Sequence, residues 1–368
     1  MVKSIGIRDR APQFQPVDLA DAPHVDALLT RLGLGPLDPT GISSPTGRND
    51  SWAGTTANGT PVFVKQLTDH GHEVRLRRSE AVWAAGSGLI DTPRLLGSDP
   101  DNSLLVFEYL QGGDPGSDLV ARNAFDADLC ERAGAAVAAV HHLTPEGFDT
   151  AEHPLPPVAL LEAIPLSRYT EGSAAELAMW RLLHADAPLI EALRALRSAD
   201  TEQIPSRCPI HGDMRLDQFL LVDGKLYLTD FEESRIGDPA RDVGAFAGEM
   251  LFQAIASIPA SLADASPYGH TATHEEILAT GIVEIEQRSP LIRRFFRAYL
   301  AAGPTAAAED QDLGVRAAAY AGWHMLDRML AATANSVRLS PINKAAAGIG
   351  RTVLLSPADF TSSLGLEA

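Results

Sequence analysis

The sequence predicts an α+β protein in which a small antiparallel-sheet lobe precedes a large helical lobe. Strand and turn signals concentrate in residues 41–110, where Asn58-Gly59 is typical of a hairpin turn. Residues 111–368 instead have alanine, leucine and valine at helix spacing. Gly112-Gly113 lies where the pattern changes and suits a flexible link. We expect residues 1–40 to form an extension with one short helix.

The first lobe is expected to alternate strands with one long helix. Val62-Phe63-Val64 and residues 104–107 are apolar runs of strand length, and Leu95-Leu96 indicates a further strand. Between these strands, residues 71–86 have a helical pattern. Before the lobe, Val17 to Leu34 has apolar residues at helix spacing, so we expect a short amphipathic helix there.

Five longer segments of the second lobe have helical periodicity, and one segment does not. We expect residues 259–275, which mix proline, serine, glycine and histidine, to form a loop. The expected helices are 125–142, 174–196, 241–258, 292–300 and 313–334.

Charge and composition exclude several classes of function. The formal net charge is −18, of which −15 falls in residues 111–368. This acidity argues against a nucleic-acid partner and would favour a cationic substrate. No run approaches about 18 uninterrupted apolar residues, and the N-terminus lacks the apolar core of a signal peptide, so we expect a cytoplasmic protein without a membrane partner. Two isolated cysteines argue against a disulfide framework or a zinc site.

Two aspartates stand in a spacing that suits phosphoryl transfer from ATP. Asp213 lies on a His-Gly-Asp turn, and Asp230 ends a short apolar run seventeen residues later. In such a site one carboxylate accepts the hydrogen bond of the attacking hydroxyl, and another holds the Mg²⁺ that bridges the nucleotide phosphates. An oxygen ligand five residues after the first aspartate would complete the protein's share of the metal shell, and Gln218 stands there.

These motifs resemble the aminoglycoside phosphotransferase branch of the protein-kinase-like fold. The resemblance rests on His211-Gly212-Asp213, Asp230-Phe231-Glu232 and Gly237 to Asp242, and it extends over residues 45–245. It implies a two-lobed fold, with residues 41–110 as the nucleotide-binding lobe, and an ATP- and Mg²⁺-dependent kinase. The branch usually has asparagine where this chain has Gln218. The extra methylene would shift the ligand oxygen by roughly an ångström or require another rotamer.

The resemblance also assigns the nucleotide site in the first lobe. Lys65 corresponds to the lysine that contacts the α- and β-phosphates, and Glu80, in preference to Glu73, would pair with it. Residues 46–51 would cover the phosphates, and residues 108–113 would form the hinge whose backbone binds adenine. The expected nucleotide-binding residues are therefore Lys65, Glu80, Gly47, Asn49, Glu108 and Leu110.

The second lobe supplies the expected catalytic and metal-binding residues. Asp213 would orient the acceptor hydroxyl. Arg215, two residues later, would either stabilise phosphate charge or face outward from the loop. Gln218 and Asp230 would hold Mg²⁺. We expect His211 to brace this loop through backbone contacts. We also expect Asp238 or Asp242 to fix the loop at the start of the next helix, with Asp238 as a possible N-cap.

The substrate is left open by the sequence. The run from His211 to Gln218 resembles phosphotransferase-like subunits of class V lanthipeptide and thioamitide biosynthesis. That resemblance implies phosphorylation of Ser/Thr hydroxyls in a precursor peptide, with a lyase as partner protein. The alternative substrates are small molecules with a hydroxyl group, such as aminoglycosides or metabolites. A third reading, favoured by Gln218 and a glycine-poor phosphate loop, is a pseudokinase that binds nucleotide or peptide with little turnover.

Overall fold

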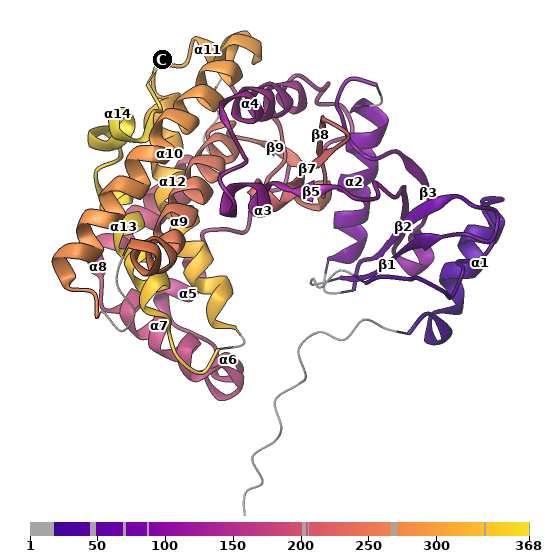
Figure 1. Ribbon diagram of the computed structural model, residues 1–368, viewed down its shortest axis with the longest axis horizontal. Coiled ribbons are helices and arrows are strands. Elements are labelled where there is room, and N and C mark those ends of the chain that lie inside the picture. Colours follow the sequence, from indigo (N-terminus) through magenta and orange to yellow (C-terminus); the bar gives the residue numbers. More distant parts are fainter. Residues whose placement is uncertain are drawn as a thin grey trace, which may run out of the picture. The chain divides into compact units, whose positions relative to one another are not determined.

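The computed structural model describes residues 18–44, 49–68, 71–86, 88–200, 204, 206–265, 271–334 and 336–367. The chain divides into two compact units (Figure 1). The first unit is formed by Met1–Trp83 and Thr92–Gly112, and the second by Ala84–Asp91 and Gly113–Ala368. The N-terminal helix thus belongs to the first unit.

A four-stranded antiparallel sheet with the order β1-β2-β4-β3 forms the centre of the first unit. Gly59 has φ +82°, which suits the predicted Asn58-Gly59 turn between β1 and β2. The elements of this unit are η1 (Leu19–Asp21), α1 (Pro23–Arg31), β1 (Asp50–Thr55), β2 (Pro61–Gln66), α2 (His72–Gly86, whose last turn lies in the second unit), β3 (Leu95–Asp99), η2 (Pro100–Asn102) and β4 (Leu104–Glu108).

The two faces of this sheet are covered by different helices. Val62 and Val64 of β2 pack with Leu28 and Leu29 of α1 in one buried cluster. The alternate residue Phe63 packs with a second cluster that contains Leu76 of α2. Each fully buried Val or Leu contributes about 1.5–3 kcal/mol relative to an exposed one. Lys65, two residues after Phe63, therefore lies on the α2 face of β2.

The second unit is mostly helical, with two small antiparallel sheets, β5-β7-β8 and β6-β9. Its helices are α3 (Gly116–Ala121), α4 (Ala127–His141), α5 (Val158–Glu162), α6 (Leu166–Glu171), α7 (Ala174–His184), α8 (Ala187–Ala199), α9 (Ala240–Ala265), α10 (His274–Ala302), α11 (Thr305–Ala308), α12 (Leu313–Thr333), α13 (Pro341–Leu355) and α14 (Thr361–Leu364). Its strands and 3-10 turns are β5 (Asp114–Pro115), β6 (Cys208–Ile210), η3 (Leu216–Gln218), β7 (Phe219–Val222), β8 (Lys225–Leu228), η4 (Phe231–Glu233), β9 (Arg235–Gly237) and η5 (Pro357–Phe360).

Helix α9 lies in the core of the second unit and packs closely against α12. A Cβ on Gly244 would lie 2.3 Å from the Ala317 carbonyl oxygen, and one on Gly248 would lie 2.7 Å from that of Ala321. Glycine at both positions lets the two helix backbones approach closely. Phe246, between them, stacks on Phe295 of α10 with ring centroids 3.8 Å apart. The start of α9, just after the metal-binding loop predicted above, is thereby held by the core.

Three predicted boundaries in the second unit are wrong. The expected loop at 259–275 is helical up to Ala265 despite Pro259, because Ile258 of α9 packs against Gly281 of α10. The expected helix at 174–196 is two helices, since the Asp186 side chain accepts a hydrogen bond from Leu189 N and begins α8. The expected helix at 292–300 is the end of α10, which begins at the Thr273 capping box.

Among the described helices, α9 alone has the length and apolar composition of a membrane-spanning segment. In its most apolar window, 61% of the residues are buried inside the protein. A core helix of this kind produces the same pattern, so composition alone does not place it in a membrane.

Candidate active site

The His-Gly-Asp turn, residues 211–213, follows directly from strand β6, and we call it the catalytic turn after its predicted role. Ile210, the last residue of β6, pairs with Arg235 of β9, and the chain then turns at Gly212. Gly212 has φ +84°, and a Cβ there would lie 2.5 Å from the carbonyl oxygen of Glu233. Only glycine satisfies both constraints without displacing the loop. The turn thus presents Asp213 at a fixed place after a buried strand.

The buried carboxylate of Asp242 binds the backbone of this turn. Asp242, in the first turn of α9, accepts hydrogen bonds from His211 N at 2.6 Å and from Gly212 N at 3.0 Å. Its Oδ2 also lies 3.0 Å from His141 Nε2 on α4, and the side chains of Asp242 and His141 are both fully buried. Of the two aspartates expected to fix the loop at the start of α9, Asp242 thus binds the His-Gly-Asp turn, and Asp238 accepts a hydrogen bond from Ala240 N at 3.0 Å.

Asp242 and His141 form a buried ion pair. Burial alone would favour the neutral acid, but the hydrogen bond from His141 and the backbone amides keep the pKa of Asp242 below its ordinary value. Burial likewise opposes the imidazolium, yet Tyr299, Cys208 and Asp242 together hold the pKa of His141 well above its usual range. His141 then donates from Nε2 to Asp242 and from Nδ1 to Tyr299 Oη.

The loops of Asp213 and Asp230 are joined through Thr229. His211 Nε2 donates to the Thr229 carbonyl oxygen at 2.8 Å, and Thr229 N donates to the Gln218 carbonyl oxygen at 2.9 Å. The Thr229 hydroxyl lies 3.5 Å from Gln218 Oε1. Gln218 itself is buried, with 4% of its surface exposed. The structure therefore brings the amide of Gln218 beside the residue that precedes Asp230.

Asp230 has a left-handed backbone conformation, with φ 67° and ψ 58°. Aspartate and asparagine tolerate this region better than most residues, but it still costs free energy. The ring of Phe231, the next residue, packs against His211 with centroids 4.9 Å apart. The metal-binding position predicted for Asp230 thus lies at a strained point supported by the catalytic turn.

Asp213 is partly accessible and lies beside Arg215. In Asp213, 44% of the side-chain surface is exposed, and Oδ2 lies 3.6 Å from Arg215 Nε. Desolvation by the surrounding protein raises the pKa of Asp213, and the charge of Asp230 adds to this, while Arg215 opposes it. Arg215 Nη2 also lies 3.3 Å from Asp217. Its buried Nε has no hydrogen-bond partner in the described part of the chain.

Lys65 and Glu80 belong to the first unit, whereas Asp213, Gln218 and Asp230 belong to the second. Glu80 is half-buried and accepts a hydrogen bond from Ser98 Oγ at 2.6 Å. Glu73, the alternative partner of Lys65, is exposed in the first turn of α2. The Lys65–Glu80 ion pair stays a prediction, with Lys65 on the sheet face that α2 covers.

The other predicted nucleotide-binding residues that the structure describes belong to the first unit. Gly47 falls outside the described residues. Asn49 is buried and accepts a hydrogen bond from Arg75 Nη1 at 3.4 Å. The backbone N–H of Glu108 donates a hydrogen bond to the Arg94 carbonyl oxygen. In the predicted hinge, the Glu108 carbonyl oxygen and the backbone of Leu110 would contact adenine. Glu108 also forms a salt bridge with Arg94.

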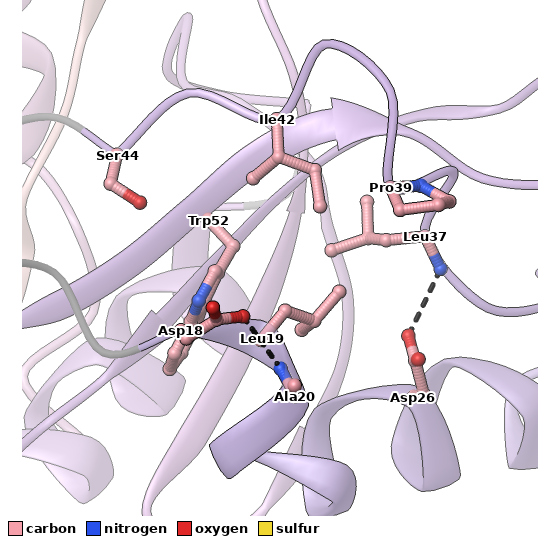
Figure 2. Close-up of a pocket in the computed structure, with 9 residues that line it drawn as sticks. All are labelled: Asp18, Leu19, Ala20, Asp26, Leu37, Pro39, Ile42, Ser44 and Trp52. Carbon is pink, nitrogen blue, oxygen red and sulfur yellow. Dashed lines mark hydrogen bonds between the residues drawn. The ribbon is translucent and has the colours of Figure 1, made fainter.

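A pocket of about 540 Å³ lies elsewhere in the first unit (Figure 2). Its apolar walls include Leu37, Ile42 and Trp52. Two carboxylates line it, but Asp26 accepts a hydrogen bond from Leu37 N, and Asp18 accepts one from Ala20 N. Both acids therefore serve the local fold, and none of the predicted site residues lines this pocket.

Three residues that support the catalytic turn were not predicted from the sequence. Thr229 links the two loops, His141 pairs with Asp242, and His153 lies 3.1 Å from the Gly212 carbonyl oxygen. His141 and Asp242 are 101 residues apart, and His153 and Gly212 are 59 apart. No local pattern marks such pairs. The position of Thr229 directly before Asp230 was the one signal that the sequence offered.

The chain matches the model of the phosphotransferase enzyme family over residues 47–276, which is more than half of its length. The chain belongs to this family. The predicted kinase-like fold of the aminoglycoside phosphotransferases and the prediction of an enzyme that transfers phosphoryl groups are confirmed. A comparison with curated proteins finds no match.

Several solved structures share the fold of this phosphotransferase. A choline/ethanolamine kinase family protein from Mesorhizobium loti has a TM-score of 0.53 and 16% identity, covering 95% of this chain and 99% of the other. The amicoumacin kinase hAmiN, in complex with AMP-PNP, Ca²⁺ and Ami, has a TM-score of 0.52 and 13% identity, covering 93% and 96%. A glucosamine kinase has a TM-score of 0.50 and 19% identity, covering 95% and 87%. At these identities the likeness shows the fold alone.

Proposed function

We propose that this phosphotransferase moves the γ-phosphoryl group of ATP to a hydroxyl group, with Mg²⁺ as the metal. The observation that carries the proposal is the link from His211 to Thr229, which holds the Asp213 loop and the Asp230 loop together in the second unit. Phosphoryl transfer needs a carboxylate at the acceptor and a second at the metal, both in fixed places. The amicoumacin kinase, bound to AMP-PNP and Ca²⁺, supports a nucleotide with a divalent cation.

Asp213 orients the acceptor in this proposal. The carboxylate accepts the hydrogen bond of the acceptor hydroxyl, whose oxygen forms a bond to the γ-phosphorus while the bond from that phosphorus to the bridging oxygen of ADP breaks. The hydroxyl proton passes to Asp213. Because the transition state is loose, position matters more than basicity. The raised pKa of Asp213 still makes its carboxylate a better proton acceptor than an ordinary aspartate.

Arg215 is the candidate for stabilising the transferred group. Its guanidinium lies beside Asp213 and Asp217, so one positive charge adjoins two carboxylates. The Nε atom is buried, so in this proposal the guanidinium acts on a nearby anion through its charge. A phosphoryl oxygen is an anion of that kind.

The residues present fit a magnesium ion. Mg²⁺ in phosphoryl-transfer sites is held by one or two carboxylates together with nucleotide phosphates and waters. Asp230 would provide the carboxylate and Gln218 the amide oxygen. The long contact of Gln218 Oε1 with the Thr229 hydroxyl, at 3.5 Å, leaves that oxygen capacity for a cation. When bound, the metal would neutralise charge on the phosphates.

For the acceptor we propose a small molecule that combines a hydroxyl group with positive charge. The similar structures include a choline/ethanolamine kinase family protein and a glucosamine kinase, whose named substrates are hydroxylated amines. The net charge of −15 in residues 111–368 would attract such a cation.

A Ser/Thr hydroxyl of a precursor peptide is the second candidate acceptor. It rests on the resemblance of residues 211–218 to phosphotransferase-like subunits of lanthipeptide biosynthesis, and it would bring a lyase as partner protein. None of the comparisons supports it. The pseudokinase reading is the third outcome, in which nucleotide binds without transfer.

One experiment separates the three readings. The purified chain is incubated with Mg²⁺ and ATP labelled at the γ-phosphate, together with either a panel of hydroxylated amines or Ser/Thr-rich peptides. Transfer to an amine supports the first reading, and transfer to a peptide supports the second. If calorimetry shows that MgATP binds, but no mixture shows phosphoryl transfer or ADP release, the result would favour the pseudokinase.

A further inference from the structure

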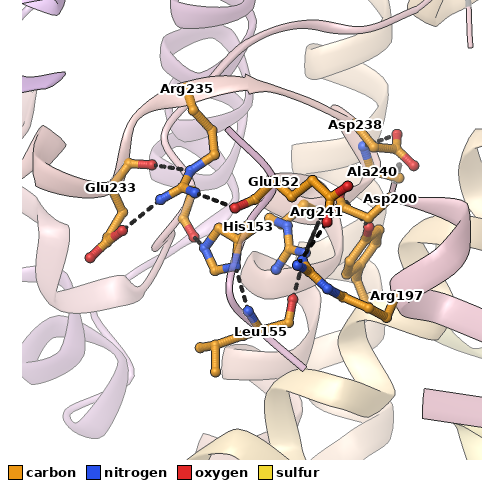
Figure 3. A network of polar contacts seen from close by, with 12 residues as sticks. Glu152, His153, Leu155, Arg197, Asp200, Glu233, Arg235, Asp238, Ala240 and Arg241 are labelled. Carbon is orange, nitrogen blue, oxygen red and sulfur yellow. Dashed lines mark hydrogen bonds and ion pairs between the residues drawn. The ribbon is translucent and has the colours of Figure 1, made fainter. Parts of the chain in front are cut away.

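The segment 149–157 is the last part of the connection between α4 and α5, and Figure 3 shows three of its residues, Glu152, His153 and Leu155, beside Arg235 and Arg241. We call this segment the strap. Its backbone oxygens accept hydrogen bonds from residues that follow the Asp230 loop. Ile236 N donates to Asp149 O at 2.8 Å. Arg235 Nη1 donates to Glu152 O at 3.1 Å, and Arg241 Nη2 donates to Leu155 O at 3.0 Å. The strap is therefore fixed to β9 and to the start of α9.

One side chain of the strap reaches the catalytic turn itself. His153 Nε2 lies 3.1 Å from the Gly212 carbonyl oxygen, and its Nδ1 accepts a hydrogen bond from Leu155 N at 3.1 Å. Because Nδ1 accepts, the ring proton sits on Nε2 and is donated to Gly212. The side chain is buried. Burial, with the nearby Arg241 and Arg235, holds the pKa of His153 well below its usual range, so the ring is neutral.

The accepting oxygen belongs to the peptide group that joins Gly212 to Asp213. The other polar atom of the same group, Asp213 N, donates to His211 Nδ1 at a long 3.4 Å. Gly212 has φ +84° and no Cβ, so its backbone can rotate this peptide plane more easily than another residue could. The bond from His153 is the shorter of the two that oppose such a rotation.

We propose that His153 is a positioning residue, which sets the direction of the Asp213 side chain by holding the peptide plane between Gly212 and Asp213. A change of ψ at Gly212 rotates this planar peptide group and, unless φ of Asp213 compensates, also moves the Cα of Asp213 and so its carboxylate. The inference rests on the proposed role of Asp213 in catalysis. Displacement of a catalytic group by about 1 Å costs up to ~10²-fold in rate.

The test uses two variants of the whole chain and measures ADP release from MgATP, with water or the best acceptor found. His153→Ala removes the donor, while His153→Gln puts an amide N–H near the position of Nε2. We expect kcat to fall about 10- to 100-fold in His153→Ala and to recover mostly in His153→Gln. The Kd of MgATP from calorimetry should stay within about twofold, because His153 contacts none of the residues proposed to hold the metal.

His184→Ala is the matched control. His184 Nε2 makes the same kind of bond, 2.8 Å to the Leu160 carbonyl oxygen, but at an exposed place away from the turn. Its kcat should match the wild type. Amide hydrogen exchange of the peptide that contains residues 211–215 gives a readout besides turnover: it should be faster in His153→Ala and restored in His153→Gln.

The outcomes separate this inference from the proposed function. A folded His153→Ala variant with wild-type kcat and exchange overturns the positioning role and leaves the phosphotransferase proposal intact. The positioning role is also overturned if the loss of kcat in His153→Ala equals the fraction of that variant that is unfolded. It is overturned as well if His153→Gln does not recover kcat. A wild-type chain without ADP release under any condition contradicts the proposed function, and the exchange measurement then still decides whether His153 holds the turn.

Discussion

His211 Nε2 donates a hydrogen bond to the Thr229 carbonyl oxygen at 2.8 Å, so the residue before Gly212 is tied to the residue before Asp230. His211 is fully buried, and its ring also packs on Phe231. A buried hydrogen bond of this kind contributes about 0.5–1.5 kcal/mol net, and leaving its acceptor unsatisfied costs more. Displacement of either loop would break the bond, so the two carboxylates are held as one assembly.

Asp213→Asn should lower turnover by about 10²- to 10⁴-fold, the range typical of a positioned acid–base group. The amide keeps the size of the side chain, and 44% of that side chain is exposed, so the melting temperature should change little. Turnover is measured as transfer from labelled ATP, and stability by thermal unfolding. Asp223→Asn, in the exposed β7–β8 turn with φ 48°, is the matched control and should be fully active. A near-native rate in Asp213→Asn would remove Asp213 from the mechanism.

Metal-dependent nucleotide binding should rely on Asp230 more than on Gln218. A carboxylate offers charge to a hard cation, whereas an amide offers only a dipole. Asp230→Asn is the suitable variant because asparagine, unlike alanine, tolerates the left-handed backbone at this position. Calorimetric titration with ATP, with and without Mg²⁺, should show a larger loss of the magnesium effect in Asp230→Asn than in Gln218→Ala. Equal losses would show that the ligand roles are assigned wrongly.

Gln218→Asn should lower the rate of phosphoryl transfer. The shorter side chain would pull the amide oxygen away from the Thr229 hydroxyl and from the proposed metal position, and metal geometry is sensitive to such shifts. A site decayed toward a pseudokinase would respond in the opposite direction, because asparagine restores the residue usual in the family. Single-turnover transfer rates decide the sign. A clear gain in rate would shift the preference to the pseudokinase.

His141→Gln should destabilise the fold by about 3–5 kcal/mol, because it leaves the Asp242 carboxylate buried without a cation. The raised pKa of His141 stabilises the fold fully below the unfolded value of about 6.5, and this contribution is lost as pH rises through the raised pKa. The lowered pKa of Asp242 stabilises it above about pH 4, and this is lost as pH falls.

The difference in unfolding free energy between the wild type and His141→Gln should therefore be largest near pH 5 to 6 and smaller at alkaline pH. Urea unfolding at several pH values measures it. His142→Gln is the control, since His142 is exposed and its Nε2 reaches the Ala302 carbonyl oxygen at 3.0 Å. A difference that does not depend on pH would argue against an ion pair between His141 and Asp242.

The sequence by itself determined the elements whose signals are local. Asn58-Gly59 predicted a turn that the structure contains, with positive φ at Gly59, because only a few residues adopt that conformation cheaply. The pattern of residues 71–86 predicted α2 within one residue, because helix spacing of apolar side chains is a property of the segment alone. The placement of Asp213 and Asp230 on two loops after short strands could also be read from their motifs.

Tertiary structure alone decided where long helices end and what holds the site. Pro259 should disfavour a helix, yet α9 continues to Ala265 because packing against α10 outweighs local propensity. His153 and Thr229 contact the catalytic turn across 59 and 18 residues of sequence, and His141 supports it through Asp242, 101 residues away. A hydrogen bond between distant residues depends on the path of the whole chain, so its partners have no spacing rule by which one sequence could reveal them.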